Sequence, residues 1–401
     1  MKTLQFIRPA TLLLCLALLW GCGEGRGTGF DVYRPADGDR PTIKLMFIGQ
    51  ITDTANATPL PEAPAAILAS AKRINAAGGV NGRLLEVHFC DDKADPNEAA
   101  KCAREAVASD VVATVGNTSN FGEFIFPILE QGNIASIGHN PISRADFSSP
   151  VAFPLQTGSP GMVASTAALL AKQGFERIHV ATVDSPAGGL AGEFARMGLT
   201  GTAATMTGLS LVPIGAPDYA TYAHSAIQDS DAVMVSMNAD QAARFIVALH
   251  QADPGTVIGV PIIATPPTTL GQIGAPSEGI WVSANYRPIN ADSPANRQFR
   301  ADMAKYAPDF RINGFSQQAW LAVETFARAM RDQRVTEFAP AAVLEAMNSL
   351  ENLETGGMIP PLTTTVENEP PFNRLFIDQV LFGRVRDGKV VLISDKWHDA
   401  L

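Results

Sequence analysis

Charge is scarce in this sequence, and most of it is negative. Charged residues make up 17% of the 401 residues, with 40 acidic against 30 basic side chains and a formal net charge of −10. A nucleic-acid partner would need the opposite sign, because lysine and arginine neutralise its phosphates. We therefore expect no nucleic-acid partner, while a hydrophobic content of 46% is ample for large buried cores.

The sequence also lacks the motifs on which familiar enzymes depend. It has no Gly-x-Ser-x-Gly nucleophile elbow, no His-Glu-x-x-His pair and no Walker-type phosphate loop. Its six histidines are scattered without an i, i+4 pair, so a catalytic metal has no ligand pattern. The carboxylate pair Asp91-Asp92 follows a predicted strand and is interpreted as a solvated turn. We expect no catalytic residue, no cofactor and no metal site.

Long apolar runs are absent beyond the N-terminus. Lys2 and Arg8 precede an apolar run over residues 12–20, shorter than the roughly 20 residues that cross a bilayer, which is typical of a secretory signal. Gly21-Cys22 ends the run and resembles the lipobox of bacterial lipoproteins. We predict a signal peptide over residues 1–21 and acylation of Cys22, which anchors the protein to a membrane on its periplasmic or cell-surface side. A plain secretory peptide or an N-terminal membrane anchor is the alternative.

The chain after residue 21 carries 28 basic and 40 acidic residues, a net charge of −12. Residues 22–40 are rich in Gly, Asp and Arg without periodicity, which predicts a flexible tether. Beyond Cys22 only Cys90 and Cys102 remain, and two nearby thiols usually pair in an oxidising compartment. We predict a Cys90–Cys102 disulfide; the alternative, a metal site, would need more ligands than His88 adds.

Strand and helix signals alternate from residue 42 onward. Short apolar runs predict strands, and amphipathic segments with acidic starts and glycine stops predict helices. Repeated strand–helix–strand units imply parallel sheets covered by helices, and about 380 residues exceed what one core sustains, so we expect two α/β units. The predicted strands are 43–49, 84–89, 111–115, 134–137, 177–183, 232–236, 260–264 and 279–282; the predicted helices are 61–77, 96–109, 121–131, 162–173, 239–251 and 315–331; residues 376–396 form a predicted hairpin.

Three stretches of the first half resemble one known family. They are Ile74-Asn75-Ala76-Ala77-Gly78-Gly79-Val80-Asn81-Gly82-Arg83-Leu84-Leu85, Cys90-Asp91-Asp92-Lys93-Ala94-Asp95-Pro96 and Val115-Gly116-Asn117-Thr118-Ser119. In this order and spacing they resemble the type I periplasmic binding proteins of the branched-chain amino acid (leucine/isoleucine/valine) ABC transporters. Weaker similarity extends from about Thr42 to the C-terminus.

The resemblance implies an α/β protein of two Rossmann-like lobes with parallel sheets, joined by a three-strand hinge. Lobe 1 is expected over residues 41–155 and 286–365, and lobe 2 over residues 156–285 and 366–401. The implied function is that of a monomeric solute-binding protein, which captures a small molecule between its lobes and delivers it to an ABC permease. A ligand-sensing lipoprotein that signals to a separate membrane receptor, or a scaffold that has lost ligand binding, is the alternative.

Open α/β sheets bind ligands in the crevice beyond the carboxyl ends of their strands, and this selects particular loops. The loop that carries Asn117, Ser119 and Asn120 follows one strand and opens a helix whose free N–H groups suit a carboxylate, although plain helix capping is the alternative. The resemblance implies that this loop holds the ligand carboxylate. The other candidate contacts in lobe 1 are Gln50, Thr52, Asn140 and Phe315.

In lobe 2 the sequence departs from the family. The 184–189 loop, which carries Ser185, lacks the tyrosine that commonly packs on the ligand. Asn238 and Thr265 stand roughly where the family has the aromatic and acidic residues that grip an ammonium group. We therefore expect a ligand without a free α-amino group, bulkier than leucine and with apolar surface.

Overall fold

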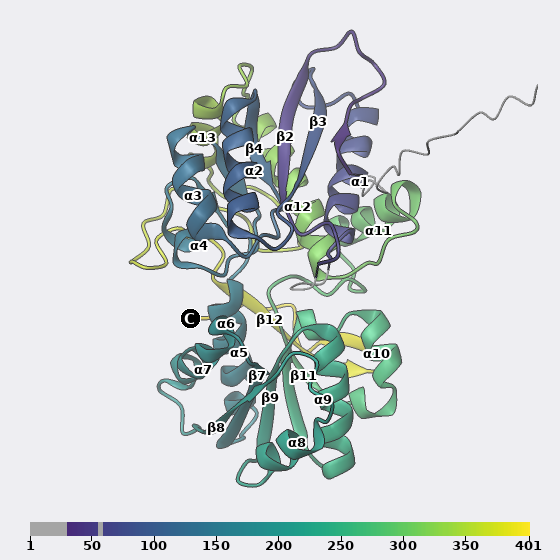
Figure 1. The fold of residues 1–401 in the computed structure, drawn as a ribbon, viewed down its shortest axis with the longest axis vertical. Coiled ribbons are helices and arrows are strands. Elements are labelled where there is room, and N and C mark those ends of the chain that lie inside the picture. The colour runs from purple at the N-terminus through teal and green to yellow at the C-terminus, as the bar shows by residue number, and fades with distance from the viewer. Residues whose placement is uncertain (1–29, 55–58) are drawn as a thin grey trace, which may run out of the picture.

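The computed structural model describes residues 30–54 and 59–401 and shows two α/β lobes stacked along the long axis of the molecule (Figure 1). The predicted signal peptide, the acylation site Cys22 and the tether up to residue 29 lie outside the described residues. Each lobe is built on a mixed, mostly parallel sheet flanked by helices. The expected α/β fold class is confirmed.

The sheet of lobe 1 has the strand order β1-β3-β2-β4-β5-β6. Neighbouring strands are parallel except β1, which runs antiparallel to β3. The central strands are continuous apolar runs because helices cover both faces of the sheet. The strands are β1 (Val32–Tyr33), β2 (Thr42–Gly49), β3 (Leu84–Asp91), β4 (Val111–Val115), β5 (Ala135–Ile137) and β6 (Ala152–Phe153).

Helices from two distant parts of the chain cover this sheet. They are α1 (Glu62–Ala76), α2 (Pro96–Ala108), α3 (Gly122–Gln131), α4 (Arg144–Ser148), α11 (Pro294–Tyr306), α12 (Gly314–Asp332) and α13 (Pro340–Asn348). Helix α12 packs along α1 and buries Trp320 completely. Arg73 of α1 binds the carboxylates of Asp302 on α11 and Glu324 on α12. These contacts fasten the late helices to the early part of lobe 1.

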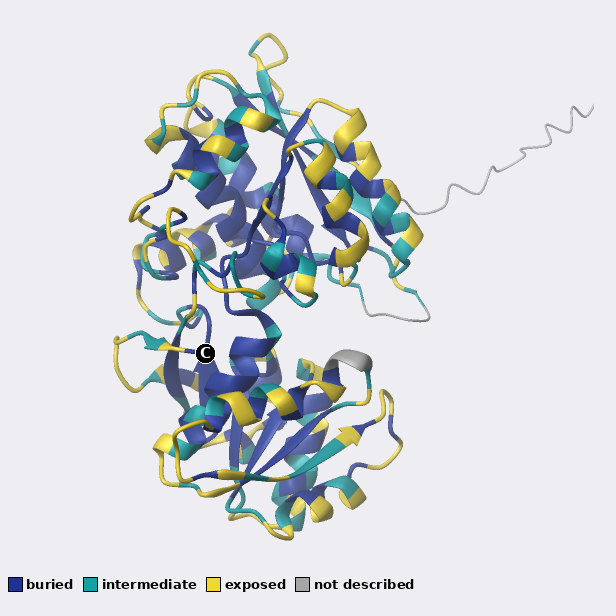
Figure 2. Cartoon of the chain, turned by 90° about the vertical axis from the view of Figure 1, so that its left-hand side faces the viewer, coloured by how far each residue is buried: buried dark blue, intermediate teal, exposed yellow. Residues whose placement is uncertain are grey.

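The sheet of lobe 2 has the order β13-β12-β11-β10-β9-β7-β8, with β12 and β13 antiparallel at one side. Its strands are β7 (Arg177–Val183), β8 (Thr205–Val212), β9 (Ala232–Ser236), β10 (Val257–Pro261), β11 (Trp281–Ala284), β12 (Gln379–Arg386), β13 (Lys389–Leu392) and β14 (His398–Asp399), which pairs with β12. Its helices are α5 (Gly158–Lys172), α6 (Pro186–Gly189), α7 (Ala191–Leu199), α8 (Ala220–Ile227), α9 (Ala239–Ala252) and α10 (Pro267–Ile273). The buried residues of each lobe form their own core (Figure 2).

The described chain passes between the two sheets at three places. The first passage runs from Phe153, at the end of β6, to the start of α5 at Gly158. The second follows Ala284 at the end of β11 and leads into α11. The third lies just before Gln379, at the start of β12.

The third passage lies further along the chain than predicted, because lobe 1 does not end at residue 365. Ile377 belongs to the lobe 1 core, and the ring of Phe376 stacks on that of Phe153 at 6.0 Å. The guanidinium of Arg374 lies over both rings and donates to the carbonyl of Ala152 at 3.0 Å. Arg374 and Ala152 are 222 residues apart, so no local pattern could show this contact.

Part of the predicted tether is ordered on lobe 1. Val32 and Tyr33 form β1 and pair with β3. The ring of Phe30 lies 5.6 Å from the rings of both Phe89 and Phe310. The prediction of a flexible tether reaching residue 40 is therefore wrong for this stretch, because its aromatic side chains find apolar partners only in the folded lobe.

The prediction omits several helices, among them α7, α8, α10, α11 and α13, and two strand predictions also need correction. Strand β10 ends at Pro261, and Ile262–Ala264 forms a 3-10 turn instead of continuing the predicted strand over 260–264. Strand β8 is not predicted at all. It lies at the edge of its sheet with few buried side chains, so its sequence shows no apolar run.

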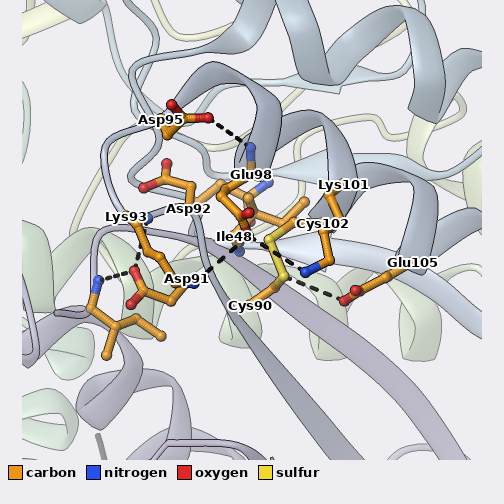
Figure 3. Close-up of a disulfide and its surroundings, with 12 residues drawn as sticks. Ile48, Cys90, Asp91, Asp92, Lys93, Asp95, Glu98, Lys101, Cys102 and Glu105 are labelled. Carbon is orange, nitrogen blue, oxygen red and sulfur yellow. Dashed lines mark hydrogen bonds and ion pairs between the residues drawn. A yellow bond between two sulfur atoms is a disulfide. The ribbon is translucent and has the colours of Figure 1, made fainter.

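The predicted disulfide joins Cys90 at the end of β3 to Cys102 in α2, with Cα atoms 5.7 Å apart (Figure 3). Asp95 begins α2 as its cap, accepting hydrogen bonds from the backbone N–H groups of Asn97 at 2.8 Å and Glu98 at 3.1 Å. The strand, the turn and the helix are thereby held together.

Asp91 and Asp92 are held by the protein instead of forming the solvated turn expected from the sequence. The Asp91 carboxylate accepts from the backbone N–H of Ile51 at 3.0 Å and from the hydroxyl of Thr52. Asp92 is 0% exposed and accepts from the backbone N–H of Ala94 at 3.0 Å. Burial raises the pKa of Asp92 above the usual aspartate value.

Candidate ligand-binding site

A cavity of about 300 Å³ lies at the boundary between the lobes, at the carboxyl ends of β7, β9 and β10. We call it the interlobe cavity. Lobe 1 contributes two residues of the loop after β5, and lobe 2 contributes the remainder. The lining residues are Asn140, Ile142, Ser159, Met162, Val163, Thr182, Val183, Ser185, Gly188, Ala191, Phe194, Ser236, Met237, Asn238, Pro261 and Ile263.

A smaller recess of about 20 Å³ adjoins this cavity and shares Asn140, Met162 and Ile263 with it. We call it the hinge recess, because Gln156 and Asn285 lie on the first two passages between the lobes. Its volume is that of about one water molecule. The lining residues are Asn140, Gln156, Met162, Ile262, Ile263, Asn285, Tyr286, Gly314, Phe315 and Gln318.

Neither set of lining residues contains a charged side chain. The polar groups are hydroxyls and amides, and several are already engaged: the Thr182 hydroxyl donates to the carbonyl of Ser236 at 2.9 Å, and the Ser185 hydroxyl accepts from the N–H of Gly188 at 3.0 Å. Burying an ion without a partner of opposite charge is costly. The site is therefore suited to groups that hydrogen-bond without a full charge.

Four side-chain amides meet at the hinge recess, three of which the sequence does not single out. Gln156 donates to Asn140 at 3.2 Å and to Gln318 at 2.8 Å, and accepts from Asn285. Gln318 in turn donates to the backbone carbonyl of Gly138 at 2.8 Å. Gln156, Asn285 and Gln318 are each at most 3% exposed. The sequence around each of these residues does not predict that it will be buried, because only the fold brings the four amides together.

The structure brings four of the predicted contacts to these two cavities. Asn140, Ser185 and Asn238 line the interlobe cavity, and Phe315 lines the hinge recess together with Asn140. Asn238 also caps α9, accepting from the N–H of Gln241 at 3.0 Å. This residue thus both caps a helix and lines the cavity.

The Asn117 side chain is used inside lobe 1. Its Oδ1 accepts from the N–H of Ile48 at 2.9 Å, and its Nδ2 donates to the hydroxyls of Thr114 at 2.9 Å and Ser136 at 3.3 Å. Asn117 therefore ties β2, β4 and β5 together and is 4% exposed. Its backbone carbonyl accepts from the N–H of Asn140 at 2.9 Å, which positions that residue at the cavity.

The other predicted contacts lie outside the two cavities. Gln50 is buried after β2, Asn120 is exposed, and the Ser119 hydroxyl accepts from the N–H of Phe121 at 3.3 Å. The Thr52 hydroxyl is engaged by Asp91. Thr265 lines a separate hollow of about 170 Å³ nearby.

A larger, open hollow of about 730 Å³ lies on lobe 2, formed by α8, α9 and α10. All of its lining residues belong to lobe 2. A ligand there would touch one lobe only and could not be enclosed by both. The interlobe cavity is the better candidate, because open α/β sheets bind at the carboxyl ends of their strands.

His139 supports the loop that carries Asn140 and Ile142. Its ring is 3% exposed; Nε2 donates to the carbonyl of Asp146 at 3.1 Å, and Nδ1 accepts from the hydroxyl of Ser136 at 3.3 Å. Burial lowers the pKa of His139, which keeps the imidazole neutral. His139 lines neither cavity and therefore supports the loop without contacting a ligand there.

Comparison with known proteins identifies the family. A sequence profile described as periplasmic binding protein matches residues 43–389. The chain belongs to the periplasmic binding protein family. Members of this family are binding proteins and not enzymes. Within the described residues no helix is long and apolar enough to cross a membrane, and no group of three or more His, Cys, Asp or Glu side chains could hold a metal.

Solved structures share the fold of this periplasmic binding protein at low sequence identity. An extracellular ligand-binding receptor from Verminephrobacter eiseniae superposes with a TM-score of 0.75 and 19% identity, over 87% of this chain and 99% of that one. A leucine-binding protein from Thermotoga maritima gives 0.67 and 17%, over 88% and 98%. A solute-binding protein of an ABC transporter from Rhodopseudomonas palustris, in complex with 3,4-dihydroxy benzoic acid, gives 0.73 and 19%, over 90% and 98%. No curated protein matches the sequence.

Proposed function

We propose that this protein is the solute-binding component of an ABC transporter and captures, between its lobes, a small organic molecule that lacks an ammonium group. One observation carries the proposal: among the residues that the structure describes, no Asp or Glu lines the interlobe cavity or the hinge recess. An ammonium group enclosed there would lose its hydration without gaining a carboxylate partner. The branched-chain amino acid specificity of the family members that the sequence resembles is therefore not proposed for this chain.

The helix ends around the site support the same conclusion. Helices α5, α9 and α12 begin at Gly158, Ala239 and Gly314, next to or among the residues that line the two cavities. Helix N-termini present free N–H groups and the positive end of the helix dipole. They favour hydrogen-bond acceptors on the ligand and disfavour a cation.

The size and the apolar lining of the interlobe cavity indicate a ligand with an apolar body. A volume of about 300 Å³ is at the lower end of the usual range for small-molecule sites. Met162, Val163, Phe194 and Ile263 supply apolar surface. Structures with this fold include complexes with benzoate, with 3,4-dihydroxy benzoic acid and with isoleucine. The fold by itself therefore does not determine which head group the ligand carries.

We assign ligand contacts to Asn140, Ser185, Asn238 and Phe315, which line the two cavities. Ser119 and Asn120 are proposed contacts in a more closed arrangement of the lobes, since hinge closure commonly brings loops of both lobes onto a ligand. Gln50, Thr52, Asn117 and Thr265 are proposed to position these loops.

The proposal includes export and acylation at Cys22, which would hold the protein as a monomer on the outer side of a membrane, next to its permease. Metabolic labelling with an alkyne-tagged fatty acid tests this directly. The full chain should take up the label and Cys22→Ser should not, while Cys15→Ser serves as the matched control and should be labelled normally. Labelling that persists in Cys22→Ser would contradict the assignment.

Matched pairs of ligands test the proposed class. The chain from residue 23 onward would be screened by thermal shift against leucine and isocaproate, phenylalanine and hydrocinnamate, and the corresponding amides. A ligand that binds only the folded state raises the melting temperature, so the members without an ammonium group should shift it and the amino acids should not. Shifts with the amino acids alone, or none with any compound, would overturn the proposal.

Uptake of a compound found in this way distinguishes transport from sensing. Deletion of the gene in its host should lower uptake of the labelled compound, and a plasmid copy should restore it. Unchanged uptake would overturn the transport role and favour the sensing alternative.

A further inference from the structure

The hydrogen bonds around the hinge recess have a fixed direction, because one end of the chain of amides is a backbone carbonyl. The oxygen of Gly138 can only accept, so the Gln318 atom that faces it at 2.8 Å must be the donor Nε2. The Gln318 Oε1 is then the atom that faces Gln156 at 2.8 Å. Gln156 must therefore donate through its own Nε2.

The orientation of Gln156 fixes those of its two remaining neighbours. Its Nε2 has a second hydrogen, which goes to the Oδ1 of Asn140 at 3.2 Å. Its Oε1 accepts from the Nδ2 of Asn285. Amide nitrogen and oxygen are usually hard to tell apart, but here every assignment follows from the Gly138 carbonyl.

Two amide atoms are left over at the recess, besides the hydroxyl of Tyr286, which is buried without a hydrogen-bond partner among the described residues. Within the described residues, the Nδ2 of Asn140 and the Oδ1 of Asn285 take part in no hydrogen bond between side chains or with the backbone. Both residues line the hinge recess, and Asn140 lines the interlobe cavity as well. The amides thus offer one donor from lobe 1 and one acceptor from the second passage, around a space of about one polar atom, and the Tyr286 hydroxyl can either donate or accept beside them.

We propose that this pair selects a ligand whose polar end is uncharged and can both accept and donate a hydrogen bond, as a carboxamide or a hydroxyl does. The ligand would accept from Asn140 Nδ2 and donate to Asn285 Oδ1. This inference rests on the proposed function and narrows its ligand class. The same group would contact lobe 1 and the hinge together, so recognition and lobe closure would depend on one head group.

Charged head groups fail at this pair for opposite reasons. A carboxylate can accept from Asn140 but leaves the Asn285 oxygen facing another acceptor, and the lining offers no cation. An ammonium group can donate to Asn285 but meets the donor of Asn140, and the lining offers no anion. In both cases a buried polar group stays unpaired, which costs more than the hydrogen bond itself contributes.

A head-group series on constant apolar bodies tests the inference. Calorimetry on the chain from residue 23 onward would compare benzamide, benzyl alcohol, benzoate and benzylamine, and the same four derivatives of cyclohexane. Within each body the amide or the alcohol should bind about 10- to 100-fold more tightly than the acid and the amine. Acids that bind as tightly as the amides would overturn this inference and leave the proposed function intact. Binding of amines alone, or of no compound in either screen, would overturn the proposed function and this inference with it.

Variants at Asn140 test whether this residue causes the preference for an uncharged head group. Asn140→Asp keeps the acceptor for Gln156 but replaces the free donor by an oxygen, so affinity for the amide should fall at least about tenfold. Asn140→Ala removes the donor without adding charge and should also weaken the amide, which keeps the test valid if Asn140→Asp folds poorly. Asn97→Asp makes the same chemical change at an exposed position outside both cavities and should bind normally. Unchanged affinity in both Asn140 variants would refute the assigned contact.

Discussion

The side-chain amides of Gln156 and Asn285 are hydrogen-bonded to each other although they lie on two different segments that join the lobes. Gln156 also donates to Asn140 and Gln318 of lobe 1, so a single buried side chain links both segments to that lobe. The hinge and the candidate site therefore share their polar contacts.

Replacing Gln156 should destabilise the protein. Gln156→Leu has a similar volume but leaves a donor of Asn285 and acceptors of Gln318 and Asn140 unpaired, and each unpaired buried group costs about 1–3 kcal/mol. We expect the free energy of unfolding to fall by about 2 kcal/mol or more in urea titrations. Gln251→Leu, on the exposed face of α9, is the matched control and should change it by less than about 0.5 kcal/mol. Equal effects in the two variants would refute the role of the network.

Replacing a helical glycine by alanine should change the stability of the protein in opposite directions at two positions. At Gly198 in α7 an added Cβ would lie 2.0 Å from the carbonyl oxygen of Ala164 in α5, so Gly198→Ala must push the two helices apart. We expect a loss of at least about 1–3 kcal/mol, as for other overpacked contacts. At Gly271 in α10 nothing lies within 4 Å, and Gly271→Ala should stabilise by about 0.5–1 kcal/mol. Thermal unfolding of both variants tests the pair.

Removal of the Cys90–Cys102 disulfide should lower stability, because the bond restricts the unfolded chain. Its two cysteines are 12 residues apart, and a loop of this length is worth about 3 kcal/mol. We expect a loss of this size in the Cys90→Ser/Cys102→Ser double variant. Addition of dithiothreitol should lower the melting temperature of the parent chain and leave the double variant unchanged. A drop in both would point to another effect of the reductant.

Stability should depend on pH through Asp92. Burial raises the pKa of this carboxyl in the folded state, so the folded protein holds a proton that the unfolded chain releases. The free-energy cost of burying this carboxylate in its ionised form is absent below the ordinary aspartate pKa. It grows as the pH rises from there to the higher pKa of the folded state. Asp92→Asn should therefore be more stable than the parent at pH 7, and this advantage should shrink as the pH falls to about 4. Exposed Asp309→Asn is the control; an advantage of Asp92→Asn that does not change with pH would contradict the assignment.

The main elements of the fold were predictable because their signals are local. Apolar runs such as 111–115 become buried central strands, and the Cys90–Cys102 pair forms the expected disulfide. Edge elements carry no such signal. Strand β8 buries too few side chains, and Phe30 finds its aromatic partners only after distant segments pack together.

The candidate site was predictable only in part, for the same reason. Asn140, Ser185 and Asn238 follow strands, and the position after a parallel strand is a local feature that leads to the cavity. The sequence by itself thus determined the two α/β lobes, the family and the loops that border the cleft. Only the tertiary structure decided that the Asn117 side chain bonds to the strands of lobe 1, and that Gln156 donates to Gln318, 162 residues further along the chain. The physical reason is that hydrogen-bond partners and their direction depend on which distant segments the fold brings within reach.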